Sequence, residues 1–150
     1  MTTQEPLRAT VDKFSFTVPT DRVYSPEHCW VLRDGVDIKV GLTDFRQQTI
    51  GDVAFVDCKP TGTVLAAGEE LAGVETIKAN VVVPSPVAGT VATTNEALGQ
   101  QPELVNEDCY GRGWLMALTP AKEGDLDLLL SPSVYLALML KEAEAAKARR

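Results

Sequence analysis

The fold is decided by residues 73–89, which read GVETIKANVVVPSPVAG. Val74 before the turn and Val81–Val83 after it favour two β-strands, because β-branched residues are enriched in strands. The tip between these strands carries Lys78. A lysine at a hairpin tip is ordinarily a solvated turn residue. Whether this lysine has a function depends on the segments that surround it.

Composition and charge limit what the chain can do. The 150 residues are 45% hydrophobic and 23% charged, which predicts one globular domain with a core of its own. The net charge of −7 and the pI of about 4.7 argue against a nucleic-acid partner, because phosphate binding needs clustered positive charge.

The sequence shows no membrane, targeting or metal signal. Its apolar runs are shorter than the roughly 18 residues that a membrane span needs, and residues 1–6 lack the basic and apolar parts of a leader. We therefore expect a cytoplasmic protein without a membrane partner. Three cysteines and one histidine show neither a CxxC pair nor zinc-ligand spacing, so we expect no disulfide framework and no metal site.

Short apolar runs separated by turn residues predict a mainly β fold. Tyr24–Leu32 leads into a strand, and after a DG turn Val36–Gly41 alternates as its antiparallel partner. Thr43 is expected to cap a short helix that Gly51 ends, and Val53–Val56 to follow as a buried strand. Short strands with glycine and proline between them are typical of a small sandwich or barrel.

The two ends of the chain are expected to differ from its middle. Residues 1–20 form an N-terminal arm in which Phe14–Val18 alternates as a short edge strand, and residues 21–130 form the domain. A Ser-Pro pair predicts the start of a C-terminal helix over residues 131–150, which packs on the domain and frays in its polar end, Glu142 to Arg150. The apolar residues of this helix are Val134, Leu136, Leu138, Met139 and Leu140.

Around Lys78 the sequence resembles the glycine cleavage H proteins. The tip reads ETIKA at residues 75–79, follows a GEE turn and precedes P-x-PV-x-G-x-V at residues 84–91. Further blocks match in chain order: YSPEH-x-WV at 24–31, VGLTDF at 40–45, GDV-x-FV at 51–56, NE-x-L at 95–98 and PELVNED-x-YG-x-GW at 102–114. The resemblance implies a lipoyl-domain-like barrel-sandwich hybrid with short helices and a C-terminal α-helix. It also implies a lipoate amide-linked to Lys78.

A lipoylated lysine would make this chain the swinging-arm subunit of a multienzyme system. The protein supplies reach and orientation, and the lipoate supplies the reactive sulfurs. Glu75 either helps a lipoate ligase or lipoyl transferase to recognise the hairpin or is a solvated surface residue. Because the sequence offers no Ser-His-Asp order, paired carboxylate site or phosphate loop, we expect a carrier and not an enzyme.

The surface on which a loaded arm would land departs from the family pattern. In H proteins the arm that carries an aminomethyl group folds back, and carboxylates hold its amine; the resemblance places two of these at Cys29 and Val82. An unpaired buried amine costs several kcal/mol, unless Glu27 compensates. Cys109 replaces a proline of the family pattern, and His28 is interpreted as a structural histidine and not as a base. Together these five residues are the expected landing surface.

The cargo is left open between hypotheses. Cys29 and Cys109 are either thiols that exchange with the arm or small buried hydrophobic residues, and Cys58 is interpreted as structural. The leading hypothesis is a sulfur-bound cargo passed among heterodisulfide-reductase-like sulfur-oxidising enzymes. The first alternative is an aminomethyl group passed from glycine decarboxylase to an aminomethyltransferase, with dihydrolipoamide dehydrogenase reoxidising the arm. A third possibility is a lipoyl relay or an unmodified interaction module.

Overall fold

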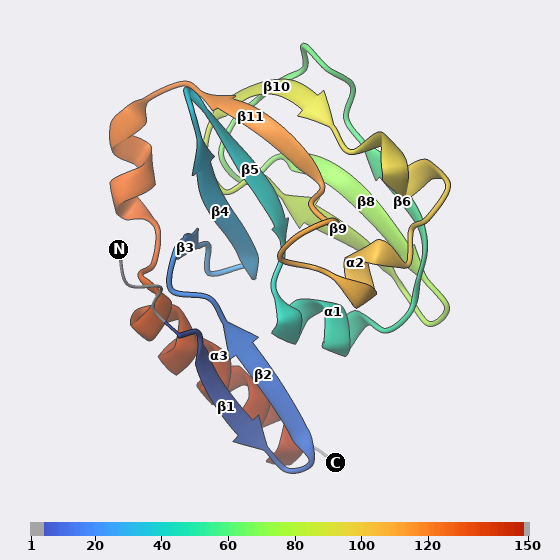
Figure 1. The fold of residues 1–150 in the computed structure, drawn as a ribbon, viewed down its shortest axis with the longest axis vertical. Helices are drawn as coiled ribbons and strands as arrows, with labels where there is room; N and C mark the ends of the chain where they lie inside the picture. The colour runs from blue at the N-terminus through green and yellow to red at the C-terminus, as the bar shows by residue number, and fades with distance from the viewer. Residues whose placement is uncertain (1–4, 149–150) are drawn as a thin grey trace.

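Two β-sheets face each other, and a hairpin packed on the last helix extends from one end of them (Figure 1). The computed structural model describes residues 5–148 of the chain. Its strands are β1 (Leu7–Val11), β2 (Phe14–Val18), β3 (Val23–Tyr24), β4 (Cys29–Asp34), β5 (Asp37–Leu42), β6 (Val53–Cys58), β7 (Val64–Leu65), β8 (Glu70–Thr76), β9 (Asn80–Pro84), β10 (Gly89–Thr94) and β11 (Met116–Pro120). Its helices are α1 (Asp44–Ile50), α2 (Leu104–Glu107), α3 (Pro132–Ala148) and the 3-10 turns η1 (Glu96–Gly99) and η2 (Glu123–Leu128).

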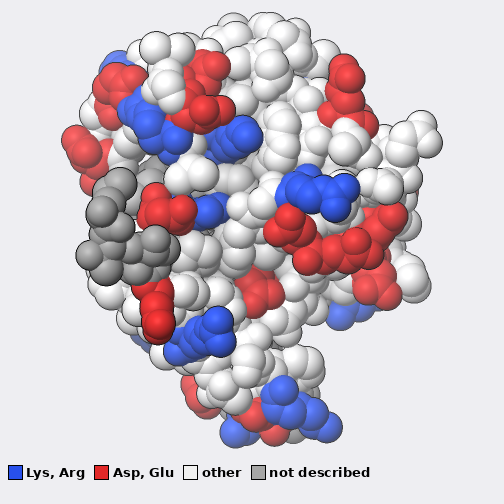
Figure 2. Space-filling view, viewed as in Figure 1, with Lys and Arg blue, Asp and Glu red and all other residues white. Residues whose placement is uncertain are grey.

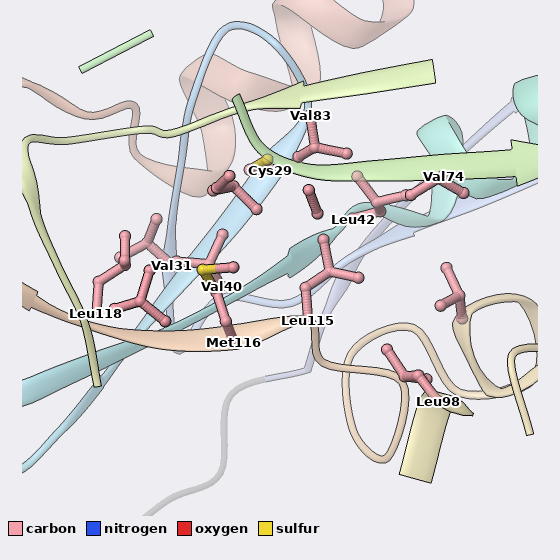
Figure 3. Packing of buried hydrophobic residues seen from close by; sticks show 14 of the residues in the cluster. Cys29, Val31, Val40, Leu42, Val74, Val83, Leu98, Leu115, Met116 and Leu118 are labelled. Carbon is pink, nitrogen blue, oxygen red and sulfur yellow. The ribbon is translucent and has the colours of Figure 1, made fainter. Parts of the chain in front are cut away.

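The core lies between a six-stranded sheet in the order β3-β4-β5-β11-β10-β7 and a three-stranded sheet in the order β6-β8-β9. Alternate residues of β5, such as Ile38 and Val40, point into this space and are fully buried. Val74 of β8 and Val83 of β9 meet them from the opposite sheet (Figure 3). The expected mainly β barrel-sandwich hybrid with a C-terminal helix is confirmed.

The N-terminal segment folds back instead of extending as an arm. β1 and β2 pair antiparallel from Leu7↔Val18 to Val11↔Phe14. Val11 and Phe16 are buried in a second apolar cluster, which also contains Met139 of α3. The strand over Phe14–Val18 is confirmed, whereas the strand before it was missed.

The C-terminal helix remains helical through its polar end. α3 continues to Ala148, because Ala143 is buried and Glu142 is hydrogen-bonded to the body of the protein. Of the expected frayed end, Glu142 to Arg150, the part up to Ala148 is helical, and residues 149 and 150 lie outside the described residues. The buried face comprises Tyr135, Met139 and Ala143, which lie four residues apart, while Val134 is 53% exposed.

Two short elements flank the tip of the β8–β9 hairpin. α1 has Thr43 as its N-cap, with Oγ1 accepting from the N–H of Arg46 at 3.3 Å, and Gly51 as its C-cap, as predicted. β6 follows directly and pairs with β8 at the sheet edge. Of the expected buried strand Val53–Val56, only Val53 is buried, and Phe55 is 53% exposed.

Within residues 5–148, no helix is long and apolar enough to cross a membrane.

Candidate functional site

The β8–β9 hairpin presents Lys78 on a short and tightly bonded tip. The last pair of the ladder is Glu75↔Asn80. Beyond it, the N–H and the Oγ1 hydroxyl of Thr76 donate to the carbonyl oxygen of Ala79 at 2.8 and 3.1 Å. The N–H of Ala79 donates in turn to Thr76 Oγ1 at 3.0 Å. Buried Thr76 therefore closes the loop, and Lys78 stays exposed at its end.

The tip is also fastened to the segment between α1 and β6. The N–H of Ile77 donates to the carbonyl oxygen of Asp52 at 3.3 Å. Asn106 of α2 holds both neighbours of Asp52, because its Nδ2 donates to Gly51 O at 3.0 Å and its Oδ1 accepts from Val53 N–H at 2.9 Å. The position of the tip is thus set by the body of the protein.

Sequence reasoning missed Thr76, Asp52 and Asn106 as residues that position the lysine. All three lie inside the matching blocks, but their roles depend on contacts between distant segments. The only local signal is a threonine directly before the turn, whose hydroxyl can bond to nearby backbone groups.

The side chain of Lys78 lies along the C-terminal end of α1. Its Cε is 3.2 Å from the point where a Cβ on residue 51 would stand, and that residue is glycine. Gly51 has φ 85° and ψ −165°, a backbone region that only glycine adopts without strain. Gly51 therefore gives the lysine stem room and ends the helix.

Lys78 is one of the residues that line an open groove of about 360 Å³. Gln48 and Thr49 of α1 contribute polar atoms to its lining. Its apolar lining comes from β1, β2, α1 and α3 and consists of Val11, Phe14, Phe16, Phe45, Ala143 and Ala146. Among the described residues that line the groove, Lys78 is the one charged residue.

A second, smaller groove of about 200 Å³ lies on the outer face of the three-stranded sheet. Glu75 and Val82 both line it, together with exposed Phe55. Val82 is 58% exposed, so the carboxylate expected from the family pattern is replaced by an apolar side chain on the surface. Glu75 is exposed beside the tip, where a docking protein can reach it.

The two cysteines expected on the landing surface lie inside the protein, and this corrects the prediction. Cys29 is 0% exposed and packs in the core beside Val83 (Figure 3). Cys109 is 7% exposed, and its carbonyl oxygen accepts from the Trp30 indole at 2.8 Å. Burial raises the pKa of each of these thiols from 9.0 to about 12. Since the thiolate is the nucleophile, neither thiol can readily exchange with an arm at neutral pH.

His28 is a buried structural residue and not part of an open surface. It is 6% exposed and sits at φ 73°, with its Nδ1 2.8 Å from the hydroxyl of Tyr135. Its Nε2 lies 2.9 Å from Oε1 of Glu142. Through these two contacts, His28 connects the segment before β4 with helix α3. Of the expected landing residues, Glu27 and Val82 are exposed.

Acidic residues are concentrated at α2. Acidic side chains gather over α2 and its ends, and Figure 2 shows them together on one side of the molecule. They are the exposed residues Glu103, Glu107 and Asp108. Within residues 5–148, Lys78 makes no ion pair, and no group of three His, Cys, Asp or Glu residues could hold a metal ion.

The lysine fits a covalently attached group. An exposed amine outside any described ion pair can be acylated without breaking a salt bridge, and the anchored tip then fixes where the added arm starts. An exposed lysine on an anchored hairpin of a barrel-sandwich hybrid is the arrangement of carrier proteins, which hold their cargo on a covalently attached prosthetic arm.

A family model described as glycine cleavage H-protein matches residues 22–142, so the chain belongs to the glycine cleavage H-protein family. Proteins of this family are non-catalytic carriers with a lipoate covalently attached to a lysine.

Individual relatives agree with this assignment. The glycine cleavage system H protein of Thermus thermophilus is 42% identical over 126 residues, which are 84% of this chain and 98% of that protein. The probable glycine cleavage system H protein of Haloarcula marismortui is 45% identical over 121 residues, or 81% and 95% of the two chains. The crystal structure of the H protein from Mycobacterium marinum superimposes with a TM-score of 0.72 at 29% identity, over 80% of this chain and 97% of that one.

Proposed function

We propose that Lys78 carries the lipoate and that the chain is the carrier protein of glycine cleavage. The observation that carries this proposal is the position of Lys78, exposed on a tip that Thr76 closes and Asp52 fastens. The relatives named above support the glycine cleavage assignment over the sulfur hypothesis, because their names give that system.

The chain's own part in this function is to present the arm. The lipoate supplies a dithiolane, which can open to bind a transferable group. Thr76 and Asn106 hold the tip still, so the arm sweeps a limited volume around docked enzymes and reaches a high effective concentration there. Exposed Glu75 marks the hairpin for the lipoate ligase or lipoyl transferase, and the acidic surface steers basic docking sites towards it.

The partners follow from the family. We infer that glycine decarboxylase loads an aminomethyl group, an aminomethyltransferase unloads it and dihydrolipoamide dehydrogenase reoxidises the arm. The sulfur hypothesis keeps one supporting observation, since neither Cys29 nor Val82 is a carboxylate that could hold an amine. It loses the other, because Cys29 and Cys109 are buried.

Intact mass and reconstitution test the proposal. Co-expression with a lipoate ligase should add one lipoyl group to the wild type and none to Lys78→Arg. Lys13→Arg is the matched control, because Lys13 is also an exposed lysine at a hairpin turn. The lipoylated protein should support glycine decarboxylation with the three partner enzymes.

The outcomes separate the hypotheses. Absence of the lipoyl mass on Lys78 would leave only the unmodified interaction module. A lipoylated protein that is inactive with the glycine cleavage enzymes would favour the sulfur-bound cargo or the lipoyl relay. Activity that survives Lys78→Arg would show that the arm is elsewhere.

A further inference from the structure

The outer face of the three-stranded sheet lies beside the hairpin tip that carries Lys78. Alternate residues of β6, β8 and β9 point outward there, and the strand register arranges them in two rows of three. The rows are Phe55–Glu75–Asn80, nearer the tip, and Asp57–Gly73–Val82 behind it. The five side chains are exposed. This face therefore continues the surface that presents the lysine.

Gly73 makes the middle of this face hollow. It has no side chain, so a depression remains between Asp57 and Val82, its neighbours on the two flanking strands. The residues of both rows line the second groove, of about 200 Å³. The one described atom within 4 Å of a Cβ built on residue 73 is Glu70 Oε2, at 4.0 Å. A side chain would fit at this position, so the depression results from the glycine itself.

The groove holds two carboxylates that are free to bind a cation. The ion pairs within residues 5–148 include neither Asp57 nor Glu75, and Lys59 at the end of β6 is paired with Glu70 at 3.7 Å. Asp57 and Glu75 are diagonal neighbours on β6 and β8, a relation that sets residues about 7–8 Å apart. A cation placed between them can contact both.

The other side chains of the groove favour arginine as that cation. Phe55 is 53% exposed and Val82 is 58% exposed, so both offer apolar surface. A guanidinium group is planar and stacks on an aromatic face, and its five donors can serve two carboxylates at once. The hydrocarbon stem of an arginine can lie over Gly73. The volume is below the roughly 300–1,000 Å³ of small-molecule sites, which favours a single protein side chain.

The position beside Lys78 indicates which protein supplies the arginine. To attach lipoate, an enzyme brings the carbonyl carbon of an activated lipoyl group to Lys78 Nζ. The amide C–N bond forms, the activating group leaves and the amine loses a proton. The enzyme must therefore touch the tip, and Glu75 of the groove is three residues from Lys78. Enzymes that act on the loaded arm meet its far end.

We propose that the groove around Gly73 is a docking site for an arginine of the enzyme that attaches lipoate to Lys78. This inference rests on the proposed lipoylation of that lysine. The guanidinium lies between Asp57 and Glu75, with its face on Phe55. Recognition of the carrier thus extends from the hairpin to the neighbouring strand β6, which supplies a carboxylate and an aromatic ring.

The experiment measures steady-state lipoylation of the full-length unmodified protein by the lipoate-attaching enzyme of the same organism, followed by intact mass. Asp57→Asn should raise KM about tenfold, because a charge-assisted hydrogen bond is lost. It should leave kcat unchanged, since Lys78 is still presented as before. Asp57→Glu keeps the charge and should largely restore the wild-type KM. Asp34→Asn is the matched control, because Asp34 is an exposed strand aspartate outside the groove.

Gly73→Val tests the depression. The added side chain occupies the space of the arginine stem and should raise KM about tenfold. Its Cβ has room and valine favours strands, so the melting temperature should stay the same or rise. A purely structural role of Gly73 would instead lower the melting temperature. Phe55→Leu keeps an apolar side chain without an aromatic face and should raise KM less than Gly73→Val does.

Ionic strength gives a second readout. Salt screens the attraction between the groove and an arginine, so KM of the wild type should rise with salt concentration. The slope should be shallower for Asp57→Asn and unchanged for Asp34→Asn. Equal slopes in all three proteins would contradict docking through Asp57.

The outcomes separate this inference from the proposed function. Wild-type KM values in Asp57→Asn and Gly73→Val, with the wild type lipoylated on Lys78, would overturn the docking site and leave the carrier function intact. A rise in KM seen only when the loaded protein meets glycine decarboxylase would overturn the assignment to the lipoate-attaching enzyme. Absence of lipoate on Lys78 of the wild type would overturn both proposals.

Discussion

The stem of Lys78 lies against Gly51, with its Cε 3.2 Å from the position that a Cβ of residue 51 would occupy. The glycine that ends α1 and the lysine that ends β8's hairpin are therefore neighbours, although they are far apart in the sequence. Helix termination and lysine presentation depend on the same residue.

Replacing Gly51 should disturb both the end of α1 and the presentation of Lys78. Gly51→Ala forces an L-residue into a backbone region that costs about 1–3 kcal/mol, and we expect the free energy of unfolding to fall by that amount. Chemical denaturation measures it. Gly99→Ala is the control, because Gly99 has open space around it and no positive φ. Equal effects of the two substitutions would contradict the assigned role of Gly51.

Thr76→Val should impair lipoylation more than folding. The substitution removes the hydroxyl that bonds to both polar backbone groups of Ala79, and leaves the Ala79 N–H without its acceptor. We expect a loss of about 1 kcal/mol in stability and roughly a tenfold lower kcat/KM for the lipoate ligase, because the lysine is no longer held in place. Thr93→Val, at an exposed strand position, serves as control. A ligase rate unchanged from wild type would contradict this role.

Substituting carboxylates at the two positions where the family pattern has them should destabilise the fold to different extents. Cys29→Glu places a charge at a fully buried position and should destabilise the fold by several kcal/mol. Val82→Asp lies at a site that is 58% exposed and should cost less than about 1 kcal/mol. Thermal unfolding of both variants checks this. Val82→Asp is therefore the substitution suited to testing whether the cargo is an amine, and similar stability of the two variants would contradict the burial of Cys29.

Stability should fall as the pH rises above about 9. Burial raises the pKa of Cys29 and Cys109 from 9.0 to about 12, and that of Cys58 to about 11. Below pH 9 these thiols are protonated in both the folded and the unfolded chain, so they do not lower the free energy of unfolding there. Between pH 9 and 12 the unfolded thiols ionise first, and each can lower stability by up to about 1.4 kcal/mol per pH unit.

Burial also raises the pKa of Tyr24, Tyr110 and Tyr135 above 10.0, which continues the loss at higher pH. Urea midpoints measured across this range should fall with an unchanged m-value. A midpoint that stays constant up to about pH 11 would contradict the burial of these groups.

Much of the fold follows from local patterns in the sequence. The DG turn predicts the pairing of β4 with β5, and Thr43 and Gly51 mark the ends of α1. β1 was missed although LRATV alternates apolar and polar residues as a strand does. Its burial depends on packing against α3, which lies at the other end of the chain. Likewise, the polar end of α3 stays helical through contacts with distant residues.

Site residues could be predicted from the sequence only where a motif assigns them a role. Lys78 is identified by its surrounding blocks, but the burial of Cys29 is not. β4 is covered on both faces: Cys29 and Val31 pack in the core between the sheets, while Trp30 packs in the second cluster. Three consecutive buried residues break the alternation of a half-exposed strand, so the face of Cys29 could not be read from its neighbours.

The acceptor lysine and the groove beside it differ in how early they can form. The bonds between Thr76 and Ala79 that close the tip need only the β8–β9 hairpin, whose strands are adjacent in the sequence. The groove needs Phe14 and Ala146 together, and is complete only when both ends of the chain have docked. Because local contacts close before distant ones, a chain that is still folding already displays its lysine to a modifying enzyme before the groove beside it is complete.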